Sequence, residues 1–175
     1  MKYEILIAGF GGQGVLFTGK VMAYAGLKDG REVSWMPSYG PEMRGGTTNC
    51  SVVISDEPIG SPIVTEPDIL IAMNTPSLDK FVGAVVPGGK VFLDSSVVQA
   101  DIKRDDIEVY AVPATQMTAE HELRSLGNLI LLGKVYAETQ FSTEQSLEAA
   151  IKACVPARNA HLIEPNLRAI RLCRE

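Results

Sequence analysis

Short apolar runs alternate with turns rich in glycine, proline and polar residues along most of this chain. Runs of this length are typical of buried strands, and they predict strands at 3–9, 32–37, 49–55, 68–74, 89–96 and 107–112. Apolar or small residues at every third or fourth position predict helices at 12–28 and 77–85. An extended piece that ends near Val64 follows strand 49–55, which indicates an antiparallel edge added to a parallel sheet.

The pattern becomes mainly helical from residue 114 onward, in three pieces at about 122–139, 143–153 and 165–173. Ser142 or Thr143 can cap the second piece, and Thr75 is expected to cap helix 77–85. Alternating strands and helices are typical of an α/β protein. We therefore expect a single Rossmann-like domain over residues 1–175, with a mostly parallel sheet, an antiparallel edge and a helical C-terminal part.

Composition narrows the possible functions. A net charge of −5 without a basic stripe argues against nucleic-acid binding. No apolar run approaches the roughly 18 residues of a membrane span, and Glu4 fits a signal peptide poorly, so we expect a cytoplasmic protein without a membrane partner. No catalytic residue is assigned, because the sequence shows no plausible pair of nucleophile and base. No metal site is assigned either, because metal-ligand spacing is missing among the cysteines and histidines: Cys50, Cys154, Cys173, His121 and His161.

A glycine-rich turn follows the first predicted strand in the stretch AGFGGQGVLFTGK, residues 8–20. Gly9, Gly11 and Gly14 match the dinucleotide fingerprint G-x-G-x-x-G, in which the N–H groups at a helix start can receive an anion. The alternative is that these glycines serve only strand–helix packing. NAD binding also requires a carboxylate at the end of the second strand, but that strand ends with SWMP, so the NAD interpretation is disfavoured.

A second unusual loop, SYGPEMRGGTTN, occupies residues 38–49. Arg44 stands beside Gly45 and Gly46, where the backbone can come close to a ligand, and a guanidinium binds carboxylates or phosphates through two hydrogen bonds. The alternative is an interface loop in which Glu42 and Arg44 pair with each other or with a partner protein. Both interpretations remain open.

Four stretches together resemble the gamma subunits of 2-oxoacid:ferredoxin oxidoreductases: IAGFGGQGV, SYGPEMRGGTTNCSVVIS, DILIAMN and NLILLGKVYA. The resemblance extends from residue 3 to about residue 170. It implies an enzyme subunit, not active alone, in a hetero-oligomer that converts a 2-oxoacid such as pyruvate, 2-oxoisovalerate or 2-oxoglutarate into an acyl-coenzyme A. The implied partners are alpha, beta and delta subunits, which hold thiamine diphosphate, Mg²⁺ and [4Fe–4S] clusters, and ferredoxin as electron acceptor.

The same resemblance implies that both loops contact coenzyme A or the rim of the thiamine site. The candidate binding residues are Gly11, Gly12, Gln13, Gly14, Arg44, Gly45, Gly46 and Thr47. Ligands of open α/β sheets collect beyond the carboxyl ends of the strands, so these residues are expected to face one crevice. Two other functions are kept as alternatives: a stand-alone nucleotide-binding or sensing module, and a small NAD-dependent reductase.

Overall fold

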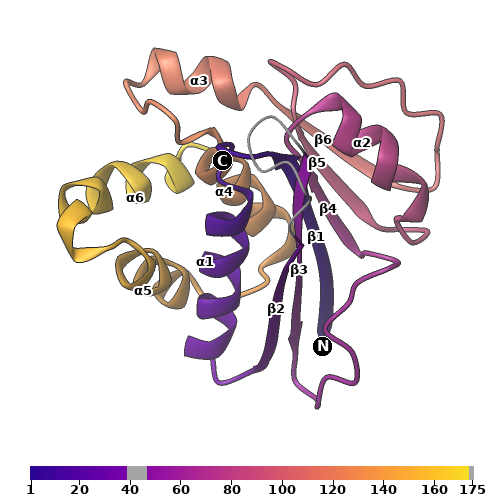
Figure 1. The fold of residues 1–175 in the computed structure, drawn as a ribbon, viewed down its shortest axis with the longest axis horizontal. Helices are drawn as coiled ribbons and strands as arrows, with labels where there is room; N and C mark the ends of the chain where they lie inside the picture. The colour runs from indigo at the N-terminus through magenta and orange to yellow at the C-terminus, as the bar shows by residue number, and fades with distance from the viewer. Residues whose placement is uncertain (39–46, 174–175) are drawn as a thin grey trace.

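A twisted mixed sheet forms the centre of the molecule (Figure 1), for which the computed structural model describes residues 1–38 and 47–173. Six strands occur in the described residues, in the spatial order β2-β3-β1-β4-β5-β6. Pairs β1–β4, β4–β5 and β5–β6 are parallel, whereas β3 is antiparallel to both β1 and β2. The strands are β1 (Lys2–Phe10), β2 (Glu32–Ser38), β3 (Thr47–Ser55), β4 (Ile69–Ala72), β5 (Lys90–Asp94) and β6 (Glu108–Val112). The predicted fold class, an α/β fold with an antiparallel edge, is confirmed.

The construction of that edge differs from the prediction. Residues 56–68 form no strand, although an extended piece ending near Val64 was expected to build the antiparallel edge. Instead β3 returns beside β2, with Ser38 opposite Asn49 and Glu32 opposite Ser55. This antiparallel pair then joins the parallel strands through β3, which pairs with β1 along its whole length.

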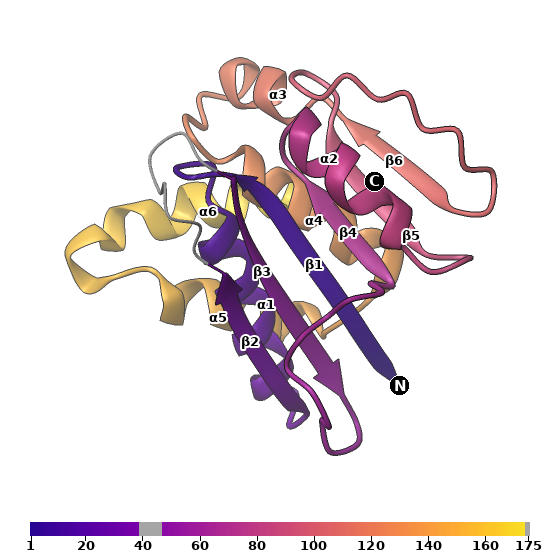
Figure 2. The same cartoon turned by 45° about the vertical axis from the view of Figure 1, so that its right-hand side comes forward.

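Helices cover both faces of the sheet. α2 (Thr75–Phe81) lies on one face, and α1 (Val15–Lys28) and α4 (Gly127–Thr139) lie on the other (Figure 2). α5 (Glu144–Cys154) and α6 (Ile163–Arg171) pack outside α1 and α4, whereas α3 (Ala114–Glu120) stands at the end of the sheet (Figure 1). Two 3₁₀ segments complete the set, Val82–Ala84 and Ala157–Leu162.

The start of the helix predicted at 122–139 is wrong, whereas its end at residue 139 is correct. The chain forms α3, turns, and starts α4 only at Gly127. The turn contains Glu122 and Ser125 in the left-handed conformation, with φ of 56° and 63°, which is incompatible with a continuous right-handed helix. The apolar spacing hides this break, because Leu123 is buried and keeps the helical rhythm across the turn.

Helix caps follow the sequence prediction in one of two cases. The hydroxyl of Thr143 accepts a hydrogen bond from Ser146 N at 3.2 Å and caps α5, as expected. The cap of α2 lies one residue earlier than predicted: Asn74, not Thr75, accepts the hydrogen bond from Ser77 N at 2.8 Å. An amide oxygen serves this role as well as a hydroxyl.

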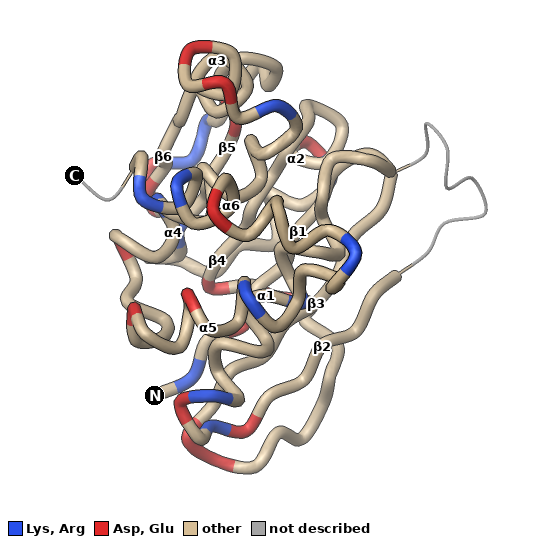
Figure 3. Tube along the Cα trace, turned by 90° about the vertical axis from the view of Figure 1, so that its left-hand side faces the viewer, with Lys and Arg blue, Asp and Glu red and all other residues tan. Residues whose placement is uncertain are grey.

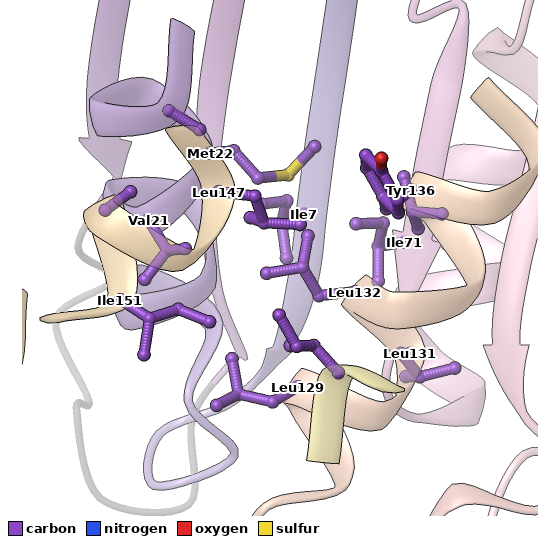
Figure 4. Close-up of a cluster of buried hydrophobic side chains, with 14 of the residues drawn as sticks. Ile7, Val21, Met22, Ile71, Leu129, Leu131, Leu132, Tyr136, Leu147 and Ile151 are labelled. Carbon is purple, nitrogen blue, oxygen red and sulfur yellow. The ribbon is translucent and has the colours of Figure 1, made fainter. Parts of the chain in front are cut away.

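The main hydrophobic core lies between the sheet and the helices α1, α4 and α5 (Figure 4). Ile7 and Ile71 from neighbouring strands meet Met22, Leu132 and Leu147 from the three helices there. A second, smaller core lies under α2. None of the helices in the described residues is long and apolar enough to cross a membrane.

Cys50 is a core residue, in agreement with the buried strand predicted at 49–55. Its side chain is fully buried on β3, and its thiol lies 3.6 Å from the carbonyl oxygen of Val15. Burial raises the pKa of this thiol to about 12, so the thiolate required for redox or nucleophilic chemistry does not form near neutral pH.

Candidate functional site

The glycine turn lies where β1 ends and α1 begins, at the carboxyl end of the parallel strands. Gly12 and Gly14 have φ of 93° and 79°, a conformation that L side chains rarely adopt. Gly14 is the N-cap of α1 and, having no side chain, gives no capping hydrogen bond; the first turn of the helix also carries no acidic residue. The first N–H groups of α1 and its positive end are therefore not neutralised by a side chain of that turn.

Gln13 is the only residue of the turn with a side chain, and that side chain points into the protein framework. Its Oε1 accepts hydrogen bonds from Phe10 N at 2.7 Å and from Asn74 Nδ2 at 3.2 Å. Its Nε2 donates to the carbonyl oxygen of Met73 at 2.9 Å. The Gln13 amide therefore bridges the ends of β1 and β4, a role that the sequence did not indicate.

A polar cavity of about 190 Å³ opens beside this turn, between the strand ends and the starts of α3 and α4. Asp94, the last residue of β5, lines it with a side chain that is only 5% exposed. Its carboxylate accepts hydrogen bonds from Thr115 Oγ1 at 2.6 Å, Thr115 N at 3.0 Å and Ser96 N at 3.0 Å. Sequence reasoning missed Asp94, although its place at the end of a predicted strand was a usable signal.

Asn128, near the start of α4, also lines the cavity. Its Nδ2 donates to Thr18 Oγ1 at 3.1 Å and lies 3.4 Å from the carbonyl oxygen of Gly14. A Cβ on Gly14 would collide with this amide. The missing side chain of Gly14 therefore makes room for the Asn128 amide of α4.

A second, more apolar cavity of about 260 Å³ adjoins the first one. The two cavities share Gly12, Ser125 and Asn128. Phe17, Leu126, Val155, Pro156 and Leu162 supply the apolar part of its lining. The turn thus borders a polar space on one side and a largely apolar one on the other.

The structure brings together five of the eight predicted binding residues. Residues 11–14 form the turn itself, and Thr47 opens β3 opposite Phe10, so it lies at the same end of the sheet. Arg44, Gly45 and Gly46 lie outside the described residues. Contact of any of these residues with coenzyme A stays a prediction.

The sheet order also bears on the NAD interpretation. In a dinucleotide fold the strand after the glycine helix lies beside β1. Here β3 lies between β1 and β2, so the end of β2 stands two strand spacings, about 10 Å, from the strand that carries the turn. Even a carboxylate at Ser38 would not be adjacent to the turn.

Charged and metal-ligating residues are dispersed over the described residues. Figure 3 shows basic and acidic residues interspersed along the helical side of the chain, not gathered in one basic stripe. No group of three or more His, Cys, Asp or Glu in the described residues is placed to hold a metal ion. His121, at the C-terminal end of α3, and His161 are both exposed.

The comparisons with known proteins all indicate the same protein family. The family model described as "Pyruvate ferredoxin/flavodoxin oxidoreductase" matches residues 4–175. The ketoisovalerate oxidoreductase subunit VorA of Methanothermobacter marburgensis is 47% identical over 136 residues, which cover 78% of this chain and 28% of that protein. The 2-oxoglutarate synthase subunit KorC of Methanocaldococcus jannaschii is 38% identical over 159 residues, which cover 89% of this chain and 85% of KorC.

The fold agrees with a solved structure over nearly the full chain. The gamma subunit of a keto/oxoacid ferredoxin oxidoreductase from Geobacter sulfurreducens matches with a TM-score of 0.85 and 29% identity, covering 99% of this chain and 95% of that one. The chain spans about a third or less of the length of VorA proteins but most of the length of this gamma subunit and of KorC.

Proposed function

The chain belongs to the pyruvate ferredoxin/flavodoxin oxidoreductase family, and on that premise we propose that it is the gamma-type subunit of a 2-oxoacid:ferredoxin oxidoreductase. The complete enzyme oxidatively decarboxylates a 2-oxoacid, releases an acyl-coenzyme A and passes electrons to ferredoxin. The observation that carries this proposal is the match over residues 4–175, together with the near full-length correspondence to a solved gamma subunit.

The same proposal assigns the redox chemistry to partner chains. Alpha and beta subunits hold thiamine diphosphate and Mg²⁺, and the beta and delta subunits hold [4Fe–4S] clusters. Two observations support a role beside other polypeptides. KorC is a subunit of nearly this length, and VorA contains a matching segment within a much longer polypeptide. The same unit thus occurs both separately and as part of a larger chain.

We assign this chain's own contribution to coenzyme A, at the crevice beside the glycine turn. The N–H groups of Gly11, Gly12 and Gly14 and the uncapped start of α1 favour a phosphate or another negatively polarised group. The N–H of Gln13 instead donates to the carbonyl oxygen of Phe10 at 3.1 Å. Arg44, Gly45, Gly46 and Thr47 belong to the same site in this proposal. The buried Asp94 carboxylate repels an anion, so the phosphate side of the ligand lies toward Gly12 and not toward β5.

Replacement of Arg44 by alanine tests the coenzyme A assignment in the complex reconstituted with its partner subunits. Loss of a charge-assisted hydrogen bond to phosphate should raise the KM for coenzyme A about tenfold or more, with the KM for the 2-oxoacid unchanged. Lys103→Ala, which removes a charge whose side chain is 85% exposed, is the control. A normal coenzyme A KM in an assembled Arg44→Ala complex would exclude Arg44 from the site.

A further inference from the structure

Asn74 links the glycine turn to a helix on the opposite face of the sheet. It lies two residues after the end of β4 and directly before α2, and only 4% of its surface is exposed. Its Oδ1 accepts the hydrogen bond from Ser77 N at 2.8 Å that caps α2. Its Nδ2 donates to Gln13 Oε1 at 3.2 Å. The oxygen of the Asn74 amide therefore binds α2, and its nitrogen binds the glycine turn.

The turn depends on Gln13 because it has no other side chain. Residues 11, 12 and 14 are glycines, which have the largest backbone freedom of all residues, and two of them adopt the left-handed conformation. Two of the three partners of Gln13 are backbone atoms of Phe10 and Met73 at the ends of adjacent parallel strands. Asn74 is the third partner and the one that uses a side chain.

We propose that Asn74 is a positioning residue for the glycine turn, acting through Gln13 Oε1. Its amide holds the Gln13 side chain between β1 and β4, and thereby holds the backbone of residues 11–14 over the crevice. Because the same amide caps α2, the turn and α2 are joined as one hydrogen-bonded unit across the sheet. That this position serves coenzyme A rests on the proposed function; the positioning itself does not.

Asn74→Asp separates the two roles of the side chain. A carboxylate keeps the acceptor for Ser77 N and is itself a good helix cap, but it replaces the donor to Gln13 with an oxygen that faces Oε1. Amide hydrogen exchange of the full chain should become about threefold to tenfold faster at Phe10 and Gln13, as expected for one lost neutral hydrogen bond, and stay unchanged at Ser77. Asn74→Ser, whose shorter hydroxyl can cap α2 but cannot reach Gln13, should give the same pattern.

A double-mutant cycle tests whether Asn74 acts through Gln13. In a Gln13→Ala background, Asn74→Asp should cause no further acceleration of exchange at Phe10. Unchanged exchange in both Asn74 variants, or an undiminished effect of Asn74→Asp without Gln13, would overturn the proposal.

The KM for coenzyme A, measured in the reconstituted complex, distinguishes this inference from the proposed function. A rise of about threefold to tenfold at unchanged kcat in Asn74→Ser, which adds no charge beside the turn, supports both. Faster exchange at Phe10 and Gln13 without a change in this KM supports the positioning role and contradicts the coenzyme A contact of the turn.

Discussion

Single residues in the crevice mostly serve the protein framework. The polar cavity is lined by the side chains of Gln13, Asp94 and Asn128. Each of them forms hydrogen bonds with residues at or near the ends of strands or helices. These hydrogen bonds fix the cavity walls before any ligand binds, so less conformational entropy is lost on binding. The groups left for a ligand are mainly backbone N–H groups of the turn, which is why the turn is built from glycine.

Gly12 and Gly14 both have positive φ but different surroundings, and alanine substitutions should separate the backbone strain from the collision with a neighbouring side chain. A Cβ at Gly12 meets open space, so Gly12→Ala should cost only the left-handed strain, about 1–2 kcal/mol in the free energy of unfolding. Gly14→Ala carries that strain and also displaces the Asn128 amide, so we expect at least about 3 kcal/mol. Urea unfolding of the full chain measures both values.

The double variant Gly14→Ala/Asn128→Ala is the internal check. Removing the Asn128 amide should relieve the collision, so the double variant should be less destabilised than the sum of the two single variants. Strict additivity would show that the two positions are not in contact.

Elements are joined at their ends by side chains that local sequence patterns do not reveal. The glycine turn, all six strands and the Thr143 cap follow from nearby residues, and the sequence predicted them. The break before α4 was missed because buried Leu123 continues the apolar spacing across it. The cap of α2 was placed one residue late because Asn74 and Thr75 are both good capping residues. Asn128 and Gly133 of α4 also have partners far away in the sequence. Asn128 contacts Gly14, and Gly133 lets α4 lie against the backbone of Ile170. Their spacing was visible in the sequence, but their partners were not.

Asp29 joins α1 to α5 and gives the protein an acid-sensitive connection. It follows the last residue of α1 and accepts hydrogen bonds from the Ser142 hydroxyl, from Thr143 N at 3.0 Å and from Thr143 Oγ1 at 2.8 Å. Burial raises the pKa of this carboxyl, but the hydrogen bonds outweigh it and leave the pKa below its ordinary value. A carboxylate with a lowered pKa in the folded state stabilises the fold above about pH 4 and loses that contribution as the pH falls through the lowered pKa.

Replacing Asp29 by asparagine should therefore destabilise the chain by about 1–2 kcal/mol at pH 7. The difference from the unchanged protein should shrink as the pH falls below about 4, because the unfolded carboxyl then takes up a proton more readily than the native carboxyl, whose pKa is lowered. Denaturant unfolding at several pH values measures it, with the exposed Asp105→Asn as control. A difference that stays constant down to about pH 2 would mean that the charge of Asp29 does not matter.

At the scale of the whole molecule, the inserted β3 changes what the glycine fingerprint can mean. The motif itself is the one used by dinucleotide-binding proteins. From the sequence alone, the only argument against NAD binding was the missing carboxylate at the end of the second strand. The sheet order adds a stronger reason, because the strand that carries such a carboxylate is displaced from β1 by β3. What remains is a turn at the carboxyl ends of parallel strands, open to a ligand or to a neighbouring subunit.

The proposed division of labour predicts that the purified chain does not oxidise pyruvate, 2-oxoisovalerate or 2-oxoglutarate with ferredoxin or an artificial electron acceptor. Decarboxylation requires thiamine diphosphate and electron transfer requires clusters, and the proposal places both on partner subunits. Adding the alpha, beta and delta subunits should restore 2-oxoacid oxidation that depends on coenzyme A, whereas adding them without this chain should not. Turnover by the chain alone would refute the subunit assignment. Full coenzyme A-dependent activity of the partners without it would instead show that the crevice serves neither the substrate nor the assembly.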